Sequence, residues 1–122
     1  MATFESIEEV TDRHLHIIWT SPDPLVAGEM VLMYSKNAML NHWWDRVTVV
    51  AWGASQKLLL EDETVYEKVK IAQLAGVEFS SCISCAIDLG TLDELTKRGI
   101  ESIRWGQKLS LLLQNGKHVL TV

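Results

Sequence analysis

The chain has 122 residues and a mass of 13.8 kDa, which is the size of one domain. Its 11 basic and 16 acidic side chains give a formal net charge of −5, and no run of Lys or Arg occurs, which argues against nucleic acid as a partner. With 48% hydrophobic and 22% charged residues, the composition is that of a globular domain in water. A chain of this mass buries about two-thirds of its surface on folding, so it needs no disulfides to build a core.

The first twelve residues are acidic and contain no apolar run of the length that a secretory signal needs. We therefore expect a cytoplasmic protein without membrane association, in which residues 1–12 are a loosely held arm and residues 13–122 form a single domain. Two cysteines are too few for a disulfide-built fold. In a reducing compartment, a close pair is typical of a catalytic, redox or metal-binding site.

Five short segments have the length and the composition of strands, and helix-like segments separate them. The predicted strands are 14–19, 46–52, 77–81, 100–104 and 118–122. Three helices are predicted over 24–43, about 58–72 and 107–114, the first of them with Asp23 as its N-cap. Two more helices are predicted, one that begins near Cys82 and one that begins with the capping box 91–94. Such alternation predicts βαβ units, and hence an α/β fold, a three-layer α/β/α sandwich with a mainly parallel sheet of about five strands.

In a sheet of this kind, ligands bind where strands end and helices begin. At that edge we expect the two cysteines to act as catalytic residues and six neighbours to contact a substrate: Trp52, Gly53, Ser55, Ser81, Ser84 and Trp105. The histidines at positions 14, 16, 42 and 118 fall near the opposite edge, about a strand length or 17–20 Å away.

The segment Cys82-Ile-Ser-Cys85 follows a predicted strand and opens a helix. Unpaired N–H groups at a helix start stabilise a thiolate, so Cys82 is a candidate nucleophile. Zinc binding and Cys–His hydrolysis both need a histidine near the thiol, whereas a thiol–disulfide couple needs only the two cysteines. We expect no metal and no cofactor, since the common nucleotide-binding glycine motifs are absent as well. The alternative is that both cysteines merely fill a strand–helix junction.

Two other segments allow two interpretations each. The turn Trp52-Gly53-Ala-Ser55 either brings the backbone close to a ligand or a neighbour, or is a tight connection with Trp52 in the core. The first helix carries the apolar run 30–34, which is more apolar surface than one sheet face needs, and Trp43-Trp44 follows it. This excess predicts a subunit interface, unless the helix is wedged inside its own domain.

Taken together, these residues resemble the DsrE-like family of small α/β sulfur-relay proteins. The features that carry the resemblance are residues 46–53, 75–82 and 97–101, with Cys85-Ala86 and Gly90 between them. Their order and spacing match from about residue 15 to residue 122. In members of that family a cysteine at the position of Cys82 accepts sulfane sulfur as a persulfide, and Cys85 matches a second cysteine that some relatives have.

The resemblance implies a sulfur-relay protein, a sulfurtransferase or a sulfur-carrier subunit, that takes sulfur from a donor protein and passes it to an acceptor thiol. It also implies a homo-oligomer, commonly a trimer or hexamer. The alternative from a different class is a non-catalytic oligomeric scaffold or binding protein. In that case a pocket lined by Trp52, Ser55, Cys82 and Trp105 would hold a small ligand.

Overall fold

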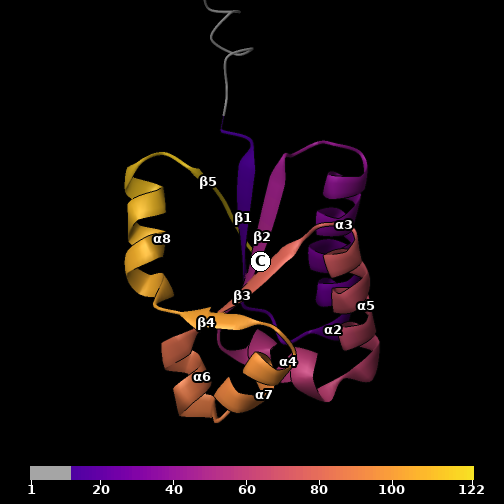
Figure 1. Ribbon diagram of the computed structural model, residues 1–122, viewed down its shortest axis with the longest axis vertical. Helices are drawn as coiled ribbons and strands as arrows, with labels where there is room; N and C mark the ends of the chain where they lie inside the picture. The colour runs from indigo at the N-terminus through magenta and orange to yellow at the C-terminus, as the bar shows by residue number, and fades with distance from the viewer. Residues whose placement is uncertain (1–11) are drawn as a thin grey trace, which may run out of the picture.

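A five-stranded sheet organises the protein, and the computed structural model describes residues 12–122 (Figure 1). The strands are β1 (His14–Trp19), β2 (Arg46–Ala51), β3 (Glu78–Cys82), β4 (Glu101–Ile103) and β5 (His118–Thr121). They lie in the order β4-β3-β2-β1-β5, and every neighbouring pair is parallel. The predicted α/β class is confirmed. Residues 1–11 of the expected arm lie outside the described part of the chain.

Helices flank the sheet on both sides. They are α2 (Pro24–Val26), the π-helical η1 (Ala27–Leu32), α3 (Met33–Leu40), α4 (Ala54–Glu61), α5 (Glu63–Leu74), α6 (Ile83–Leu89), α7 (Leu92–Lys97) and α8 (Trp105–Gln114). In Figure 1, α8 lies on one side of the sheet and α3 and α5 on the other, while α4, α6 and α7 gather below, by the carboxyl ends of the strands. No helix within residues 12–122 is long and apolar enough to span a membrane.

Local sequence explains where the helices begin and where the predicted ones divide. The Asp23 carboxylate accepts hydrogen bonds from the N–H groups of Leu25 and Val26, as its N-cap role predicts. The helix predicted over 58–72 is in fact two helices, because Asp62 adopts an extended backbone and caps α5 through the Val65 N–H at 3.0 Å. Asp62 therefore ends α4 through its backbone conformation and starts α5 through its side chain.

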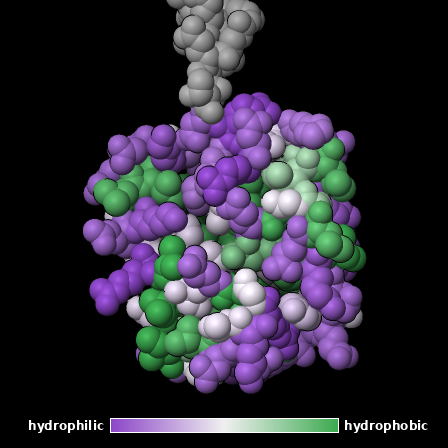
Figure 2. Space-filling view, in the orientation of Figure 1, coloured by the Kyte–Doolittle hydropathy of each residue, from purple (hydrophilic) through white to green (hydrophobic). Residues whose placement is uncertain are grey.

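The two faces of the sheet differ in character, as the alternation along β1 shows. Leu15, Ile17 and Trp19 point into the main core, which packs against η1, α3, α4 and α5. Ile18 points to the opposite face, where it joins a smaller core with Val50, Cys82 and Trp105. Helix α8 covers this second face with Trp105, Leu109 and Leu112. Figure 2 shows apolar side chains that remain on the surface at the left, over α8, and at the lower left, over α6.

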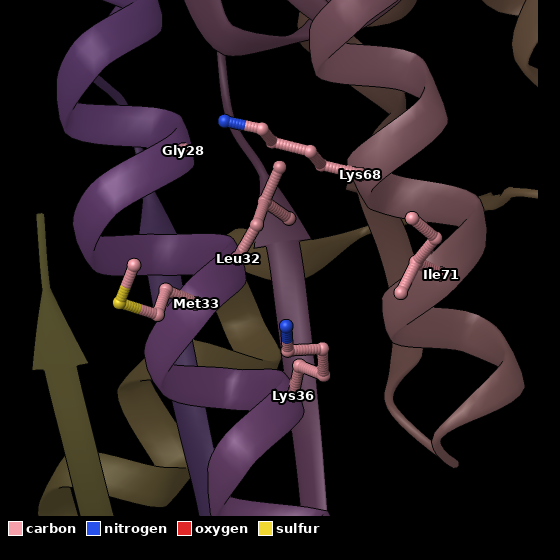
Figure 3. Close-up of a pocket in the computed structure, with 6 residues that line it drawn as sticks. All are labelled: Gly28, Leu32, Met33, Lys36, Lys68 and Ile71. Carbon is pink, nitrogen blue, oxygen red and sulfur yellow. The ribbon is translucent and has the colours of Figure 1, made fainter.

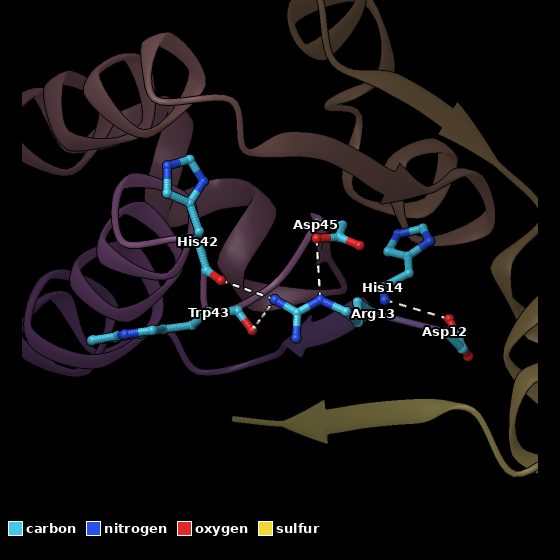
Figure 4. A network of polar contacts seen from close by, with 6 residues as sticks. All are labelled: Asp12, Arg13, His14, His42, Trp43 and Asp45. Carbon is cyan, nitrogen blue, oxygen red and sulfur yellow. Dashed lines mark hydrogen bonds and ion pairs between the residues drawn. The ribbon is translucent and has the colours of Figure 1, made fainter. Parts of the chain in front are cut away.

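An arginine clamp fixes the turn that leads into β2 (Figure 4). The Arg13 guanidinium donates to the Asp45 carboxylate at 3.1 Å and to the backbone carbonyls of His42 and Trp43. His42 has a φ of 57°, a left-handed conformation that is uncommon for a residue with a side chain. The clamp holds this turn against the start of β1 and so sets the register between β1 and β2.

The amino-terminal half of the second face is polar. His14 donates or accepts a hydrogen bond with Thr48 at 2.7 Å, Thr48 donates to Glu78, and Glu78 pairs with the Arg46 guanidinium at 2.8 Å. The His16 ring stacks 4.0 Å from that of His14 and is only 5% exposed, and its Nδ1 has no hydrogen-bond partner. Burial, together with the positive charges nearby, lowers the pKa of His16 from 6.5 to about 4.

This buried imidazole should make the protein sensitive to acid. The unfolded chain takes up a proton at His16 near pH 6.5 and the folded chain only near pH 4, so the free energy of unfolding should fall as pH drops through that window. The loss attributable to His16 is up to about 3 kcal/mol. In urea titrations, His16→Phe should reduce the difference in the free energy of unfolding between pH 7 and pH 4.5. Phenylalanine fills similar space but has no group that titrates. An unchanged pH dependence in the variant would contradict this assignment.

Candidate functional site

The carboxyl edge of the sheet places the two cysteines at the junction between β3 and α6. Cys82 is the last residue of β3 and the residue before α6, with extended backbone angles (φ −79°, ψ 120°). Its side chain is 5% exposed and belongs to the smaller core beneath Trp105. The predicted strand-to-helix setting of Cys82 is therefore present, but the side chain faces inward rather than toward open solvent.

Cys85 lies one helical turn further on, and it is the more exposed of the two free thiols. Burial raises the pKa of Cys85, and the hydrogen bond to Cys82 and the negative charge that Cys82 carries when ionised raise it further. Cys85 packs against the smaller core to which Cys82 belongs, so the two thiols are neighbours at this junction.

Gly53 forms the third part of this site. Its N–H donates a hydrogen bond toward the Cys85 sulfur, which acts against the rise in the pKa of Cys85. Gly53 has a φ of 75° and a ψ of −123°, and no atom lies within 4 Å of where a Cβ would stand. The backbone conformation, and not lack of space, requires glycine here. The Trp52–Ser55 turn is thus a tight connection with Trp52 packed on the smaller core, and it also brings backbone to a neighbour, Cys85.

The other residues predicted to contact a substrate differ in accessibility. Ser55 and Trp105 are 0% and 1% exposed: the Ser55 hydroxyl donates to the Trp19 carbonyl and accepts from the Trp52 N–H, and the Trp105 N–H donates to Ser80 at 2.8 Å. Ser81 is also buried and shares a hydrogen bond with Ser102, whereas Ser84 is exposed. The polar groups of Ser55, Ser81 and Trp105 are therefore paired inside the protein, and their role as ligand contacts stays a prediction.

Gln56 is the residue at this edge that the sequence did not single out. Its buried amide donates to the Ala51 carbonyl at 3.1 Å and to the Cys82 carbonyl at 3.0 Å, and its oxygen accepts from the Thr91 hydroxyl at 2.9 Å. The predicted capping box at Thr91 is wrong, because the Thr91 hydroxyl donates its hydrogen bond to Gln56 and makes no capping hydrogen bond to α7. One side chain thus connects β2, the end of β3 and the start of α7.

The histidines do not approach the cysteines. His14 and His16 lie in the first half of β1 and His118 begins β5, whereas Cys82 ends β3 at the other edge of the sheet. Within residues 12–122 no three His, Cys, Asp or Glu side chains gather closely enough to hold a metal ion. What the cysteine site offers is two thiols, a glycine N–H and the start of a short helix, which together suit thiol chemistry.

Comparison with known proteins identifies two solved structures of similar fold. A conserved protein of unknown function from Bacteroides thetaiotaomicron, BT1422, aligns with a TM-score of 0.88 and 27% sequence identity over 93% of this chain and 98% of its own. The ychN protein from E. coli aligns with a TM-score of 0.61 and 13% identity over 90% of this chain and 99% of its own, a likeness that concerns the fold alone. No family model and no curated protein matches the chain.

The bridge made by Gln56 should be essential for stability. Replacing it by leucine leaves two buried carbonyls and one hydroxyl without their partner, and each such group costs about 1–3 kcal/mol. We expect Gln56→Leu to lower the free energy of unfolding in urea by about 3 kcal/mol or more. Gln107→Leu, at an exposed position of α8, is the matched control and should change it by less than about 0.5 kcal/mol. Equal effects of the two substitutions would show that the bridge contributes little.

Proposed function

We propose that this protein is a cytoplasmic sulfur-relay protein that accepts sulfane sulfur as a persulfide on Cys82 and passes it to the thiol of a partner protein. The observation that carries the proposal is the placement of two free thiols at one strand–helix junction, with Cys82 directly before α6 and Cys85 within its first turn. A thiolate is the form of cysteine that attacks sulfur. The resemblance of the sequence to DsrE-like proteins points in the same direction.

The proposed reaction balances without a cofactor. The Cys82 thiolate attacks the outer sulfur of a donor persulfide R–S–SH, which leaves Cys82–S–SH and releases the donor thiolate. An acceptor thiolate then attacks the outer sulfur and regenerates the Cys82 thiolate. In a competing step, the Cys85 thiolate attacks the inner sulfur, which forms a Cys82–Cys85 disulfide and releases hydrosulfide. The i, i+3 spacing at a helix start brings the two sulfurs near enough for this step.

One observation favours a second candidate, a non-catalytic binding or scaffold protein of the same fold. With 5% of its surface exposed, Cys82 offers a donor little access, and it is absent from the lining of three cavities of about 200, 280 and 370 Å³ within residues 12–122. In that case both thiols would serve packing at the β3–α6 junction. Persulfide loading separates the two candidates.

Mass spectrometry of the intact protein after exposure to glutathione persulfide tests the proposal. Wild-type protein should gain about 32 Da, the mass of one sulfur atom, on Cys82. Cys82→Ser should abolish the gain. Cys85→Ser should retain it and prolong the lifetime of the adduct, because the nearest resolving thiol is gone.

Both substitutions are nearly isosteric, so circular dichroism should confirm that each variant folds. Loss of loading in Cys85→Ser but not in Cys82→Ser would show that Cys85, and not Cys82, carries the persulfide. Normal loading in both variants, or none in wild-type protein, would leave the binding or scaffold function as the better account.

We further propose that the relay unit is a homo-oligomer, a trimer or hexamer, and that the first helical segment contributes to its interface. Met30, Leu40 and Trp43 are 39%, 58% and 52% exposed along η1, α3 and the turn that follows. Large apolar side chains that gather in this way on one segment are typical of a subunit interface. The apolar run 30–34 is partly internal, since Val31 and Leu32 are buried in the main core.

Light scattering at micromolar concentration should give about 41 or 83 kDa, three or six times the chain mass of 13.8 kDa. Leu40→Glu should shift the mass toward that of the monomer, because it places a charge in the interface. Leu113→Glu on α8 is the matched control, since that leucine is exposed to the same 58%. A wild-type mass of 13.8 kDa would refute the oligomer, and an equal response of both variants would refute the assigned surface.

A further inference from the structure

A groove on the outer side of the helical layer, remote from the cysteines, has the features of a second site. It lies between η1 and α3 on one side and α5 on the other, and it encloses about 200 Å³ (Figure 3). Its lining is Gly28, Leu32, Met33, Lys36, Lys68 and Ile71. Three of these side chains are apolar and two carry an ammonium group, so the groove combines an apolar wall with positive charge.

The two lysines reach into this groove from opposite helices. Figure 3 shows Lys68 reaching from α5 across to the first helical segment at Gly28, and the nitrogen of Lys36 in the space between the helices. Neither ammonium forms an ion pair with a carboxylate within residues 12–122, whereas Lys70, two positions further along α5, pairs with Glu67 at 2.8 Å. In a chain whose net charge is −5, two unpaired cations in one groove leave a local positive potential.

The backbone at Gly28 is adapted to this arrangement. A Cβ at that position would stand 2.7 Å from the Lys68 Nζ, so a larger residue would require the end of the Lys68 side chain to shift. Gly28 also lies within η1, a π-helical segment of six residues between α2 and α3. Stretches of π-helix are rare and occur frequently at functional sites, because the wider turn costs stability that a structural helix has no reason to give up.

We propose that this groove binds a small organic anion, specifically a short-chain carboxylate that the positive charges of Lys36 and Lys68 attract and whose alkyl part lies on Leu32 and Ile71. A volume of 200 Å³ corresponds to about seven waters at about 30 Å³ each, which suits a ligand of about six to eight non-hydrogen atoms. The proposal does not depend on the sulfur-relay function, because none of these residues belongs to the cysteine site.

Titration of the full-length protein with sodium hexanoate, followed by two-dimensional NMR, tests this proposal. The Gly28 amide and the Ile71 methyl signals should shift with saturation. Hexan-1-ol, which lacks the charge, and sulfate, which lacks the alkyl chain, should each bind at least fivefold more weakly. Raising the salt concentration should weaken hexanoate binding.

Lysine variants test whether the ammonium groups of the groove attract the hexanoate carboxylate. Lys68→Met and Lys36→Met should each weaken hexanoate binding about fivefold or more, which is the effect of losing one partly exposed charge contact. Lys70→Met, on the same helix with its charge already paired, should change it less than twofold. The proposal is overturned if hexanoate gives no saturable shifts at Gly28 and Ile71, if hexan-1-ol binds as tightly, or if Lys70→Met weakens binding as much as Lys68→Met.

Discussion

The amide of Gln56 is the interaction on which the carboxyl edge of the sheet depends. It is fully buried and makes three hydrogen bonds, to the Ala51 and Cys82 carbonyls and to the Thr91 hydroxyl. Two carbonyl acceptors and one hydroxyl donor leave only one orientation of the amide that satisfies all of them. This single side chain therefore fixes the end of β3 relative to β2 and α7, and with it the backbone that carries Cys82.

The second face of the sheet is divided into a polar half and an apolar half. Toward the amino ends of the strands, the hydrogen-bonded chain His14, Thr48, Glu78 and Arg46 lines a cavity of about 280 Å³. Toward the carboxyl ends, Trp105 closes over Cys82. Trp105 belongs to both halves, because its ring meets His16 edge-on at 5.9 Å and its N–H donates to Ser80. Trp105 therefore lies between the half of this face that holds His14 and His16 and the half that holds Cys82.

The two cysteines of the site differ in their burial and in the effect of their surroundings. Cys82 is the more deeply buried, and Cys85 is the more exposed, yet Cys85 is the one whose pKa its partner raises. Cys85 is therefore the thiol that solvent reaches more easily, and Cys82 lies beneath Trp105 in the smaller core.

Much of the fold follows from local sequence. Short apolar runs that alternate with helix-like segments predict a parallel sheet, and Asp23 and Pro24 mark the start of the first helix because capping needs only neighbouring residues. The placement of Cys82 at a strand–helix junction, far from the histidines, also follows from the order of the elements. Packing between distant segments decided the rest. The hydroxyl of Thr91 bonds Gln56, 35 positions away, instead of capping its own helix, and Ser55 and Trp105 turn inward to partners that no local pattern reveals. The groove under Lys36 and Lys68 exists only because α3 and α5 lie side by side, and that neighbourhood is a property of the folded chain.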